Sequence, residues 1–492
     1  MPMINCALGV LSPYVPTAEN PWNTQRAMHL FRRMTYGADP ETIKTALMQD
    51  PAQIASDLVQ QAVNMPLTPD PVWAYWQLSD YDPDEDVRNE QLISQLLGWG
   101  LQVGLNMRDN GLRDVMTFFW HNHFVAKQDV YGCPSWMFQY FKVLQTHAVG
   151  NFKEFVREIG ITPAMLVFLN NVQNTVFDPN ENYARELYEL FSLGVDNGYT
   201  QEDIVETARA ITGWNGVDVN DFCGPIEFIP FLWDAGVKTI FGQTGNWGYD
   251  DVINILFEQR ADEISEYICA KLYRHFVNPT EDDQIIADMA QIFRDSNWEI
   301  APVLQALFTS EHFFDVAHVG TVIPGHIEYA IGIIKEFGYP PDDDITFAAV
   351  YAAGDYNQAI FNPTDVAGWP GNRNWINSSS IQFRWELVQA VIGYYYGIQG
   401  NSVEHLRTLA LQIVDPDKIS DVEYVTRAMI DYFLPKGLQF EQEYAEALVV
   451  FKAEVPENYF QDGTWSLNWE YAPLQVYLLL LHISNLPEYQ LK

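Results

Sequence analysis

The chain has 492 residues, of which 48% are apolar, so it can bury a large core and hold more than one packing unit. Its net charge of −38, from 65 Asp and Glu residues against 27 Lys and Arg residues, argues against nucleic acid or an anionic membrane as its main partner. Aromatic residues make up 14% of the sequence, which distinguishes it from a disordered acidic chain.

The N-terminal sequence MPMINCALGVLSPYVP lacks the basic segment of a secretory signal peptide, so the cytoplasm is the default expected location. The longest apolar run near the C-terminal end, Val476–Leu481 with its neighbours, is too short to span a bilayer. The cysteines form no CxxC pair, which argues against a zinc knuckle and against a dense disulfide framework. They are Cys6, Cys133, Cys223 and Cys269.

The hydrophobic patterning predicts a mainly α fold, a large array of helices around a single core. Residues 1–23 are expected to form an irregular lead, residues 24–395 the main helical domain, and residues 396–492 a C-terminal helical extension packed on it. Residues 217–250 are rich in Gly, Asp, Pro and aromatic residues, which predicts a small β-hairpin or loop excursion there.

In chain order, AMHLFRRMTYG predicts a first helix that ends at Gly37. Asp39-Pro40 and Asp50-Pro51 each place a capping side chain before a proline, which is the pattern of a helix start. The later helices are expected at residues 89–105, 111–125, 134–159, 251–256, 264–276, 281–293, 300–309, 422–434 and 441–451.

The stretch GLRDVMTFFWHNHFV, residues 111–125, carries apolar residues on nearly every side, which predicts a buried helix. His121 and His123 therefore need polar partners inside the core. Because positions i and i+2 lie about 200° apart on a helix, both imidazoles can bind one metal ion only if the helix ends there. For either histidine, a hydrogen-bonded core residue and a metal ligand are both open interpretations.

Residues 178–216 predict two helices joined by a short turn, the second opened by a capping box at residues 200–203. The first helix places Glu181, Arg185 and Glu189 at successive i+4 positions. That spacing is typical of a solvated ion-pair face, although the same Arg could hold an anionic group.

Glu186 lies at the edge of the apolar stripe of the same helix, so its carboxylate needs a cation, a metal ion or a proton. We expect it to face His121 or His123, either as a metal ligand or as an ion-pair partner. The apolar positions of both helical stretches are expected in the core, namely Trp120, Phe124, Leu187, Leu190 and Phe191.

The loop at residues 361–380, FNPTDVAGWPGNRNWINSSS, is long for a simple connection, and loops of this kind often carry function. We expect it to be ordered and to pack Trp369 and Trp375 near the helices of residues 178–216. The positions singled out as structural or loop residues are Trp214, Trp369, Asn374 and Trp375.

Six motifs occur in order along the chain: FWHNHFV, PAMLVFLNN, NENYARELYELFSLGV, TARAITGW, GVKTIFG and FNPTDVAGWPGNRNWI. Together they resemble the bacterial family called domain of unknown function 1800, over roughly residues 28–384 with a looser similarity near the C-terminal end. The resemblance implies a mainly helical fold and no established reaction. It also implies that members are often exported and that a sulfatase-like protein encoded nearby is an expected partner.

One departure from the family pattern affects the site. Many relatives have His-Asp before Gly-x-Lys-Thr, whereas this chain has Trp233-Asp234, so a histidine role at that position does not carry over.

The candidate functional residues are histidines and carboxylates on segments that are expected to pack together. Such donors suit zinc, iron or manganese with an open position for water or substrate. In this hypothesis Glu186 is catalytic, and Arg185 and Lys238 hold an anionic or polar substrate. The candidate metal ligands are His121, His123, His147, Glu186 and Asp234.

The alternative is a non-catalytic scaffold or assembly protein that works with a partner. Its buried polar residues would then only fix the helices against one another. Three ligands that converge would favour the enzyme, and histidines bonded only to backbone carbonyls would favour the scaffold.

Overall fold

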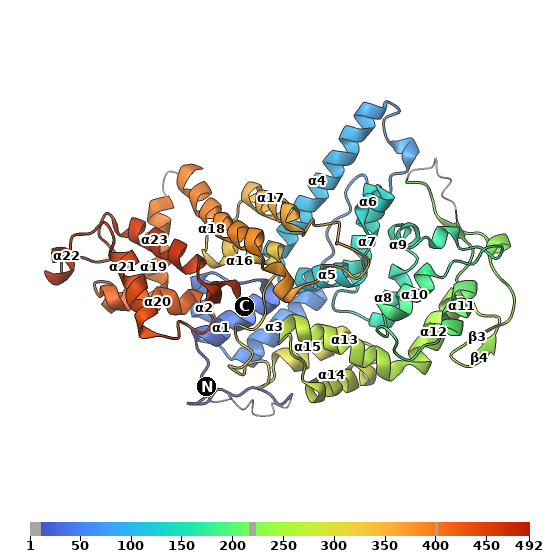
Figure 1. The fold of residues 1–492 in the computed structure, drawn as a ribbon, viewed down its shortest axis with the longest axis horizontal. Coiled ribbons are helices and arrows are strands. Elements are labelled where there is room, and N and C mark those ends of the chain that lie inside the picture. Colours follow the sequence, from blue (N-terminus) through green and yellow to red (C-terminus); the bar gives the residue numbers. More distant parts are fainter. Residues whose placement is uncertain (1–10, 216–222, 399–401) are drawn as a thin grey trace.

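The computed structural model describes residues 11–215, 223–398 and 402–492. Helices make up 61% of the chain, about twice the third found in an average soluble protein, so the predicted mainly α fold is confirmed. The buried apolar side chains form one cluster that extends from Tyr14 to Tyr489. Figure 1 shows the C-terminal helices at one end of the array and residues of about 150–250 at the other.

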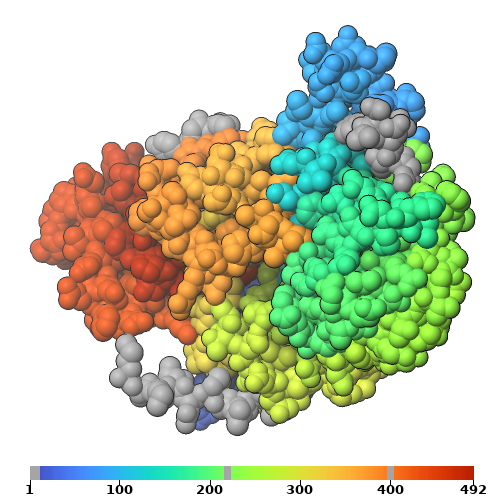
Figure 2. Space-filling view, turned by 45° about the vertical axis from the view of Figure 1, so that its right-hand side comes forward, coloured from blue at the N-terminus to red at the C-terminus, as the bar shows by residue number. Residues whose placement is uncertain are grey.

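The N-terminal helices begin where local chemistry predicts. Asp39 accepts hydrogen bonds from the amides of Glu41 and Thr42, and Asp50 accepts one from that of Gln53, each with a proline in the first turn. The helices of this part are α1 (Thr24–Thr35), α2 (Pro40–Ala46), α3 (Pro51–Asn64), α4 (Glu85–Asp109), α5 (Leu112–His123) and α6 (Gln128–Tyr131). The first half of α4 projects from the body as the blue arm in Figure 2.

The helical region predicted over residues 134–159 is two helices, α7 (Pro134–Thr146) and α8 (Phe152–Ile159). The break arises because the Asn151 side chain accepts a hydrogen bond from the Glu154 amide, 3.2 Å away, and starts a new helix. A short helix, α9 (Pro163–Phe168), follows.

Residues 178–216 form the two predicted helices, α10 (Asn182–Glu189) and α11 (Gln201–Ala210). The capping box of α11 is present, since Thr200 and Asp203 exchange side chain-to-amide hydrogen bonds of 2.9 and 3.2 Å. Four of the five predicted core side chains are fully buried, whereas Leu190, at the end of α10, is only partly buried.

Two small antiparallel pairs make up the β structure of the described residues. The first joins β1 (Trp214–Asn215) to β2 (Glu227–Phe228), and the second is the hairpin of β3 (Lys238–Ile240) and β4 (Gln243–Gly245). In the hairpin, Thr239 lies opposite Thr244. The predicted excursion is therefore present, although its first strand begins before residue 217 and residues 217–222 lie outside the described part.

The remaining helices build the rest of the array. They are α12 (Tyr249–Gln259), α13 (Ala261–Phe276), α14 (Asp283–Asp295), α15 (Ile300–Phe308), α16 (His326–Glu336), α17 (Asp343–Ala352), α18 (Ser378–Ile398), α19 (Ser402–Ile413), α20 (Val422–Phe433), α21 (Glu441–Lys452), α22 (Asn458–Gln461) and α23 (Ala472–Ser484). Helix α18 runs across the domain boundary predicted at residue 395. Within the described ranges, no helix combines the length and apolarity needed to cross a bilayer.

Two of the scattered cysteines pair. Cys133, before α7, and Cys223, before β2, form a disulfide that closes a separation of 90 residues. Cys269 is a buried free thiol in α13. The disulfide therefore ties the loop region after α11 to the helical core.

Truncating Leu187 to alanine should lower the free energy of unfolding by ~2–5 kcal/mol, because the side chain is fully buried and its removal leaves a cavity. Denaturant unfolding of Leu187→Ala measures this loss. Met48→Ala is the matched control, since Met48 is 78% exposed and should change stability by less than ~0.5 kcal/mol. Equal effects of the two substitutions would contradict the core assignment.

Candidate functional site

A pocket of about 350 Å³ lies where α5, α13, α16 and the 361–380 loop meet. It brings Asn122 of the FWHNHFV motif beside Trp369 of the GWPGN segment, 247 residues further along the chain. We call it the basic pocket. Its charged and imidazole side chains are His123, Lys271, Arg274, His275, Glu328 and Lys492, and its aromatic walls include Phe118, Phe119, Trp369 and Trp375.

The charge of the basic pocket is opposite to that of the chain. Three cationic side chains, Lys271, Arg274 and Lys492, line it against one carboxylate, Glu328. The whole chain, by contrast, carries a formal net charge of −38. A local excess of positive charge with aromatic walls suits a small anion that has an apolar part.

Lys271 is the cation of this pocket without a counter-charge. No Asp or Glu oxygen of the described residues lies within 4.0 Å of its ammonium, which donates a long hydrogen bond of 3.4 Å to the Tyr267 hydroxyl. Burial, with a smaller effect of Arg274, lowers the pKa of Lys271 to about 7. Near neutral pH this amine therefore exchanges readily between its charged and neutral forms.

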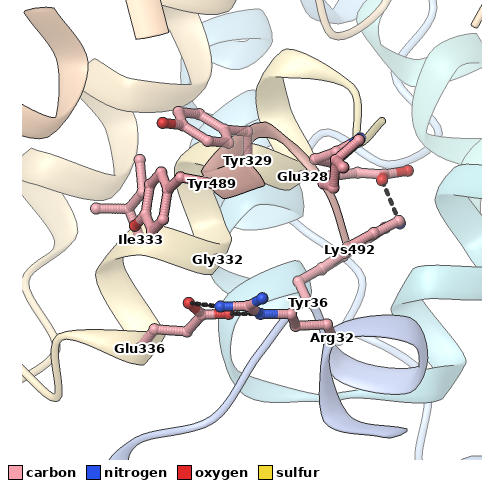
Figure 3. A pocket seen from close by; sticks show the side chains of 11 residues that line it. Arg32, Tyr36, Glu328, Tyr329, Gly332, Ile333, Glu336, Tyr489 and Lys492 are labelled. Carbon is pink, nitrogen blue, oxygen red and sulfur yellow. Dashed lines mark hydrogen bonds and ion pairs between the residues drawn. The ribbon is translucent and has the colours of Figure 1, made fainter. Parts of the chain in front are cut away.

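The other two cations of the pocket are paired. Arg274 hydrogen-bonds to Glu281, and the Lys492 ammonium lies 2.6 Å from Glu328 (Figure 3). Burial acts to raise the pKa of Glu328, but the Lys492 charge, His275 and hydrogen bonds from Lys492 and the Gly325 backbone together lower it. Glu328 is therefore held as a carboxylate at the pocket wall.

The Glu328–Lys492 pair also borders a small cavity of about 40 Å³ on its other side. Figure 3 shows Arg32 and Glu336 across that cavity, joined by two hydrogen bonds of 2.6 and 2.8 Å. A space of this size holds one or two water molecules and no substrate. The basic pocket is the larger of these two neighbouring spaces.

His123 enters the basic pocket from the end of α5. Its Nε2 lies 3.1 Å from the Phe191 carbonyl oxygen, which only accepts hydrogen bonds, so Nε2 carries the proton. The buried Nδ1 therefore keeps a lone pair, and it makes no hydrogen bond within the described ranges. Burial, followed by the nearby Lys271 charge, lowers the pKa of His123 well below its ordinary value, so the ring is neutral.

Asn122 fixes the loop against α5. Its side-chain oxygen accepts a hydrogen bond of 2.7 Å from the Trp369 amide. The Trp369 ring packs on Phe118 and His121, with ring centres 5.4 and 5.6 Å away. The loop is therefore ordered on α5, and not on α10 and α11 as the sequence suggested.

The other loop positions have structural partners. Trp375 is buried and packs on His326 at the start of α16, with ring centres 5.2 Å apart. Asn374 is exposed and donates a hydrogen bond of 3.2 Å to the Gly371 carbonyl. Trp214, in β1, packs edge-on against Phe228 of β2.

Gly368 is required where the loop crosses α5. A Cβ at this residue would lie 2.3 Å from Asn122 Oδ1 and 2.5 Å from the Asn122 carbonyl oxygen, and φ is +90°. We expect Gly368→Ala to destabilise the protein by ~1–3 kcal/mol more than Gly371→Ala. Both substitutions strain a backbone with positive φ, but only the alanine at residue 368 also clashes with Asn122. Gly371 has φ of +67°, but a Cβ there would meet no atom within 4 Å.

Thermal unfolding and limited proteolysis of the 361–380 loop measure this difference. Faster cleavage in Gly368→Ala than in Gly371→Ala is the expected result. Equal cleavage rates would show that the close approach to Asn122 does not hold the loop.

His121 is buried and has both ring nitrogens engaged. Nε2 donates to the Ile360 carbonyl at 2.9 Å, and Nδ1 lies 3.0 Å from the Tyr140 hydroxyl oxygen. Burial lowers its pKa to about 3. These contacts place His121 among the core histidines, with a carbonyl and a hydroxyl as its partners.

The remaining predicted ligands lie elsewhere. His147 pairs with Glu158, Nε2 to Oε2 2.9 Å, and Glu186 makes no hydrogen bond or ion pair with a histidine among the described residues. Burial, together with Glu189, raises the pKa of the half-buried Glu186 carboxyl. The expected contact between Glu186 and His121 or His123 is absent from the described structure.

Asp234 lies in the turn before β3, and Lys238 is the first residue of that strand. Asp234 binds Arg209 at 2.8 Å and the Gly236 amide at 2.7 Å. Although burial acts the other way, these contacts hold the pKa of Asp234 below its ordinary value. The buried Lys238 donates to the carbonyls of Asp234 and Gly236 and lies over the Trp233 ring, so both residues stabilise the turn.

Arg185 occupies the predicted ion-pair ladder, which is confirmed. Its guanidinium lies 2.9 Å from Glu181 and 3.2 Å from Glu189. Arg185, which was expected to hold an anionic substrate, is therefore already paired with the two carboxylates of the ladder.

The candidate metal ligands therefore do not converge. In the part of the chain that the structure describes, no three His, Cys, Asp or Glu side chains are grouped so that they could hold a metal ion. The predicted set fails geometrically because each donor already has a nearby partner or lies apart. Of the residues that line the basic pocket, His123, Trp369 and Trp375 were singled out from the sequence, whereas the charged ones were found only with the structure.

One sequence signal could have indicated them. Lys271, Arg274 and His275 stand at i, i+3 and i+4, so they share one face of a helix. Three basic or imidazole side chains on one face of a mostly buried helix need a counter-charge or a ligand. Glu328 and Lys492 carry no such signal, because they meet across 164 residues.

Comparison with known proteins yields one match. A family model described as a protein of unknown function (DUF1800) matches residues 29–491. No curated protein and no solved structure matches the chain.

Proposed function

Because the chain belongs to this DUF1800 family, whose description assigns no activity, we propose its function from the site: it binds a small anionic molecule in the basic pocket and acts on it. The observation that carries the proposal is Lys271, a pocket lysine with no carboxylate of the described residues within 4.0 Å, inside a chain of net charge −38. The other two cations of the pocket, Arg274 and Lys492, are paired with Glu281 and Glu328. The net negative charge of the protein repels anions in general. An anion therefore binds only where nearby cationic side chains contact it, as in this pocket.

The walls of the pocket indicate the rest of the ligand. Phe118, Phe119 and Trp369 offer apolar surface, and about 350 Å³ is at the lower end of the range for small-molecule sites. Lys271 supplies a cation that has no carboxylate partner, and Asn122 supplies an amide NH₂ group. These features suit a small carboxylate or phosphate with a short carbon skeleton.

The hypothesis of a zinc, iron or manganese enzyme is not part of this proposal. Its donors do not converge, and several are engaged with other groups, as are His121 with Ile360 and Asp234 with Arg209. No step of the proposed chemistry is routed through a metal ion.

Ligand titration tests the proposal. Trp369 and Trp375 line the pocket, so binding of pyruvate, lactate, phenylacetate or inorganic phosphate should change the tryptophan fluorescence, with calorimetry as the second measurement. Lys271→Gln should weaken binding by ~10-fold to 100-fold, which corresponds to the ~1.5–3 kcal/mol of a hydrogen bond to a charged group.

Lys142→Gln is the control, because Lys142 pairs with Asp70 on another surface and should leave binding unchanged. Absence of binding by all four anions, or binding that Lys271→Gln leaves unchanged, would overturn the proposal. Thermal unfolding of each variant shows that it is folded under the binding conditions.

A scaffold role is the second candidate, and the buried histidines favour it. His29, His121 and His123 each hydrogen-bond to a backbone carbonyl of another segment, so they fix helices in place. The α4 arm (Figure 2) also exposes apolar side chains, among them Ile93 and Leu97. A sulfatase-like protein encoded nearby is the partner that the family resemblance implies.

Co-expression with that neighbouring protein tests the scaffold. A stable complex that is lost in Ile93→Lys/Leu97→Lys would support it, and separate elution of the two wild-type proteins would count against it.

We also propose that the protein works outside the cytoplasm. The Cys133–Cys223 disulfide supports an oxidising compartment, because disulfides are rare in reducing cytosol. To test this location, the native cells are fractionated, and thiol labelling of the protein in each fraction measures whether Cys133 and Cys223 are paired. Free Cys133 and Cys223 thiols in protein from the cytosolic fraction would contradict it.

A further inference from the structure

We propose that Lys271 is a nucleophilic amine that forms an imine with the aldehyde or ketone carbonyl of a small oxo acid bound in the basic pocket. The inference rests on the proposed function, because the carboxylate of the oxo acid is the anion that the pocket holds. It adds a substrate class and a covalent step.

The position of Lys271 is the first support. Lys271 lines the pocket, and its ammonium has no carboxylate of the described chain within 4.0 Å and contacts the Tyr267 hydroxyl at 3.4 Å. Other deeply packed lysines differ, since Lys335 donates to the Thr35 carbonyl at 2.7 Å and Lys238 to two carbonyls. A nucleophilic amine needs a free lone pair at the ligand, and Lys271 alone of these three lines the basic pocket.

The protonation of Lys271 is the second support. Burial and the Arg274 charge lower its pKa to about 7, whereas an ordinary lysine has a pKa near 10.4. About half of the Lys271 side chains are therefore neutral at pH 7. The titratable groups around it are Tyr267, Arg274 and His275 on α13 and His123 on α5, with Glu328 and Lys492 on the pocket wall.

The spacing of the cations defines the substrate. Lys271 and Arg274 stand three residues apart on α13, so their Cβ atoms are ~5–6 Å apart on one helix face. A substrate carboxylate that replaces Glu281 at Arg274 then leaves the carbonyl of a short oxo acid on the Lys271 side of the same helix face. This arrangement fits 2-oxo and 3-oxo acids.

The step balances without an oxidant or a reductant. The Nζ lone pair of Lys271 attacks the carbonyl carbon, and the carbonyl π electrons move to oxygen. Both amine protons leave with that oxygen as water, and a C=N bond replaces the C=O bond. His123 lines the same pocket and keeps a lone pair on Nδ1, and in this proposal it relays a proton from the amine to the oxygen.

Reductive trapping tests the imine. The full chain is incubated with pyruvate and sodium cyanoborohydride at pH 7, digested, and analysed by peptide mass spectrometry. Lys271 should carry the reduced pyruvate adduct at least tenfold more than any other lysine, and Lys271→Arg should lose that adduct. Lys44→Arg is the control, because Lys44 is exposed on α2 and should leave the labelling of Lys271 unchanged.

The outcomes separate the two proposals. Binding of lactate, which has no carbonyl, together with absence of a Lys271 adduct from pyruvate would overturn the imine and leave the anion site standing. Absence of binding by all four anions, together with absence of the adduct, would overturn both. An adduct spread evenly over the lysines would also overturn the imine.

The pH dependence of labelling gives a second readout. In the native protein, acetylation of Lys271 by acetic anhydride should be half-maximal near pH 7 and should rise as the amine loses its proton. In urea, acetylation of Lys271 should be half-maximal near pH 10, as for an ordinary lysine. Native Lys271 that reacts only in the higher pH range would contradict a nucleophilic amine.

Discussion

Replacing Arg32 with methionine should lower the free energy of unfolding by ~3–5 kcal/mol, the cost of removing one partner of a buried ion pair. Arg32 and Glu336 are 9% and 7% exposed, and two hydrogen bonds of 2.6 and 2.8 Å join them (Figure 3). Burial acts against the Arg32 charge, but Glu336 more than offsets this and raises the pKa of Arg32. The variant leaves a buried carboxylate without its cation.

The same guanidinium also donates to the Phe433 carbonyl at 2.9 Å, so Arg32 joins α1 to both α16 and α20. Arg32→Met/Glu336→Gln is the matched control. It should recover part of the loss, because a neutral amide needs no counter-charge. Denaturant unfolding of the two variants measures the difference, and a double variant less stable than Arg32→Met would contradict an ion-pair role.

Removing the disulfide should have the second largest effect. Cys133→Ala/Cys223→Ala should lower the free energy of unfolding by ~2–5 kcal/mol, because the bridge closes a long loop and restricts the unfolded chain. The separation of 90 residues places the effect in the upper part of that range.

Reduction distinguishes the bridge from the loss of two side chains. Dithiothreitol should destabilise the wild-type protein by a similar amount and leave the double variant unchanged, as followed by thermal unfolding. Wild-type protein that keeps its stability after complete reduction would show that the bridge does not restrict the unfolded state.

Features that depend on one or two helical turns were predictable. The capping box of Thr200 and Asp203 and the ladder of Glu181, Arg185 and Glu189 lie within three or four residues, and the structure contains both. Such contacts follow from helical spacing alone, so neighbours in the sequence are neighbours in space.

The candidate site was predicted only in part, because its groups are distant in the sequence. His123 and Trp369 were both singled out, and both line the basic pocket. The partner chosen for His123 was Glu186, yet its Nε2 hydrogen-bonds to the Phe191 carbonyl. A backbone carbonyl is present at every residue, so no pattern of side chains reveals which one a histidine meets.

The sequence by itself therefore determined the mainly α fold, the starts of several helices, the family and most of the predicted core, through periodicity and local capping. Only the tertiary structure decided which polar groups share a pocket. Glu328 meets Lys492 across 164 residues, and Asn122 meets Trp369 across 247. Those pairs depend on how the helices pack. The free energy of packing comes from contacts over the whole core, so no single stretch of the sequence predicts which helices meet.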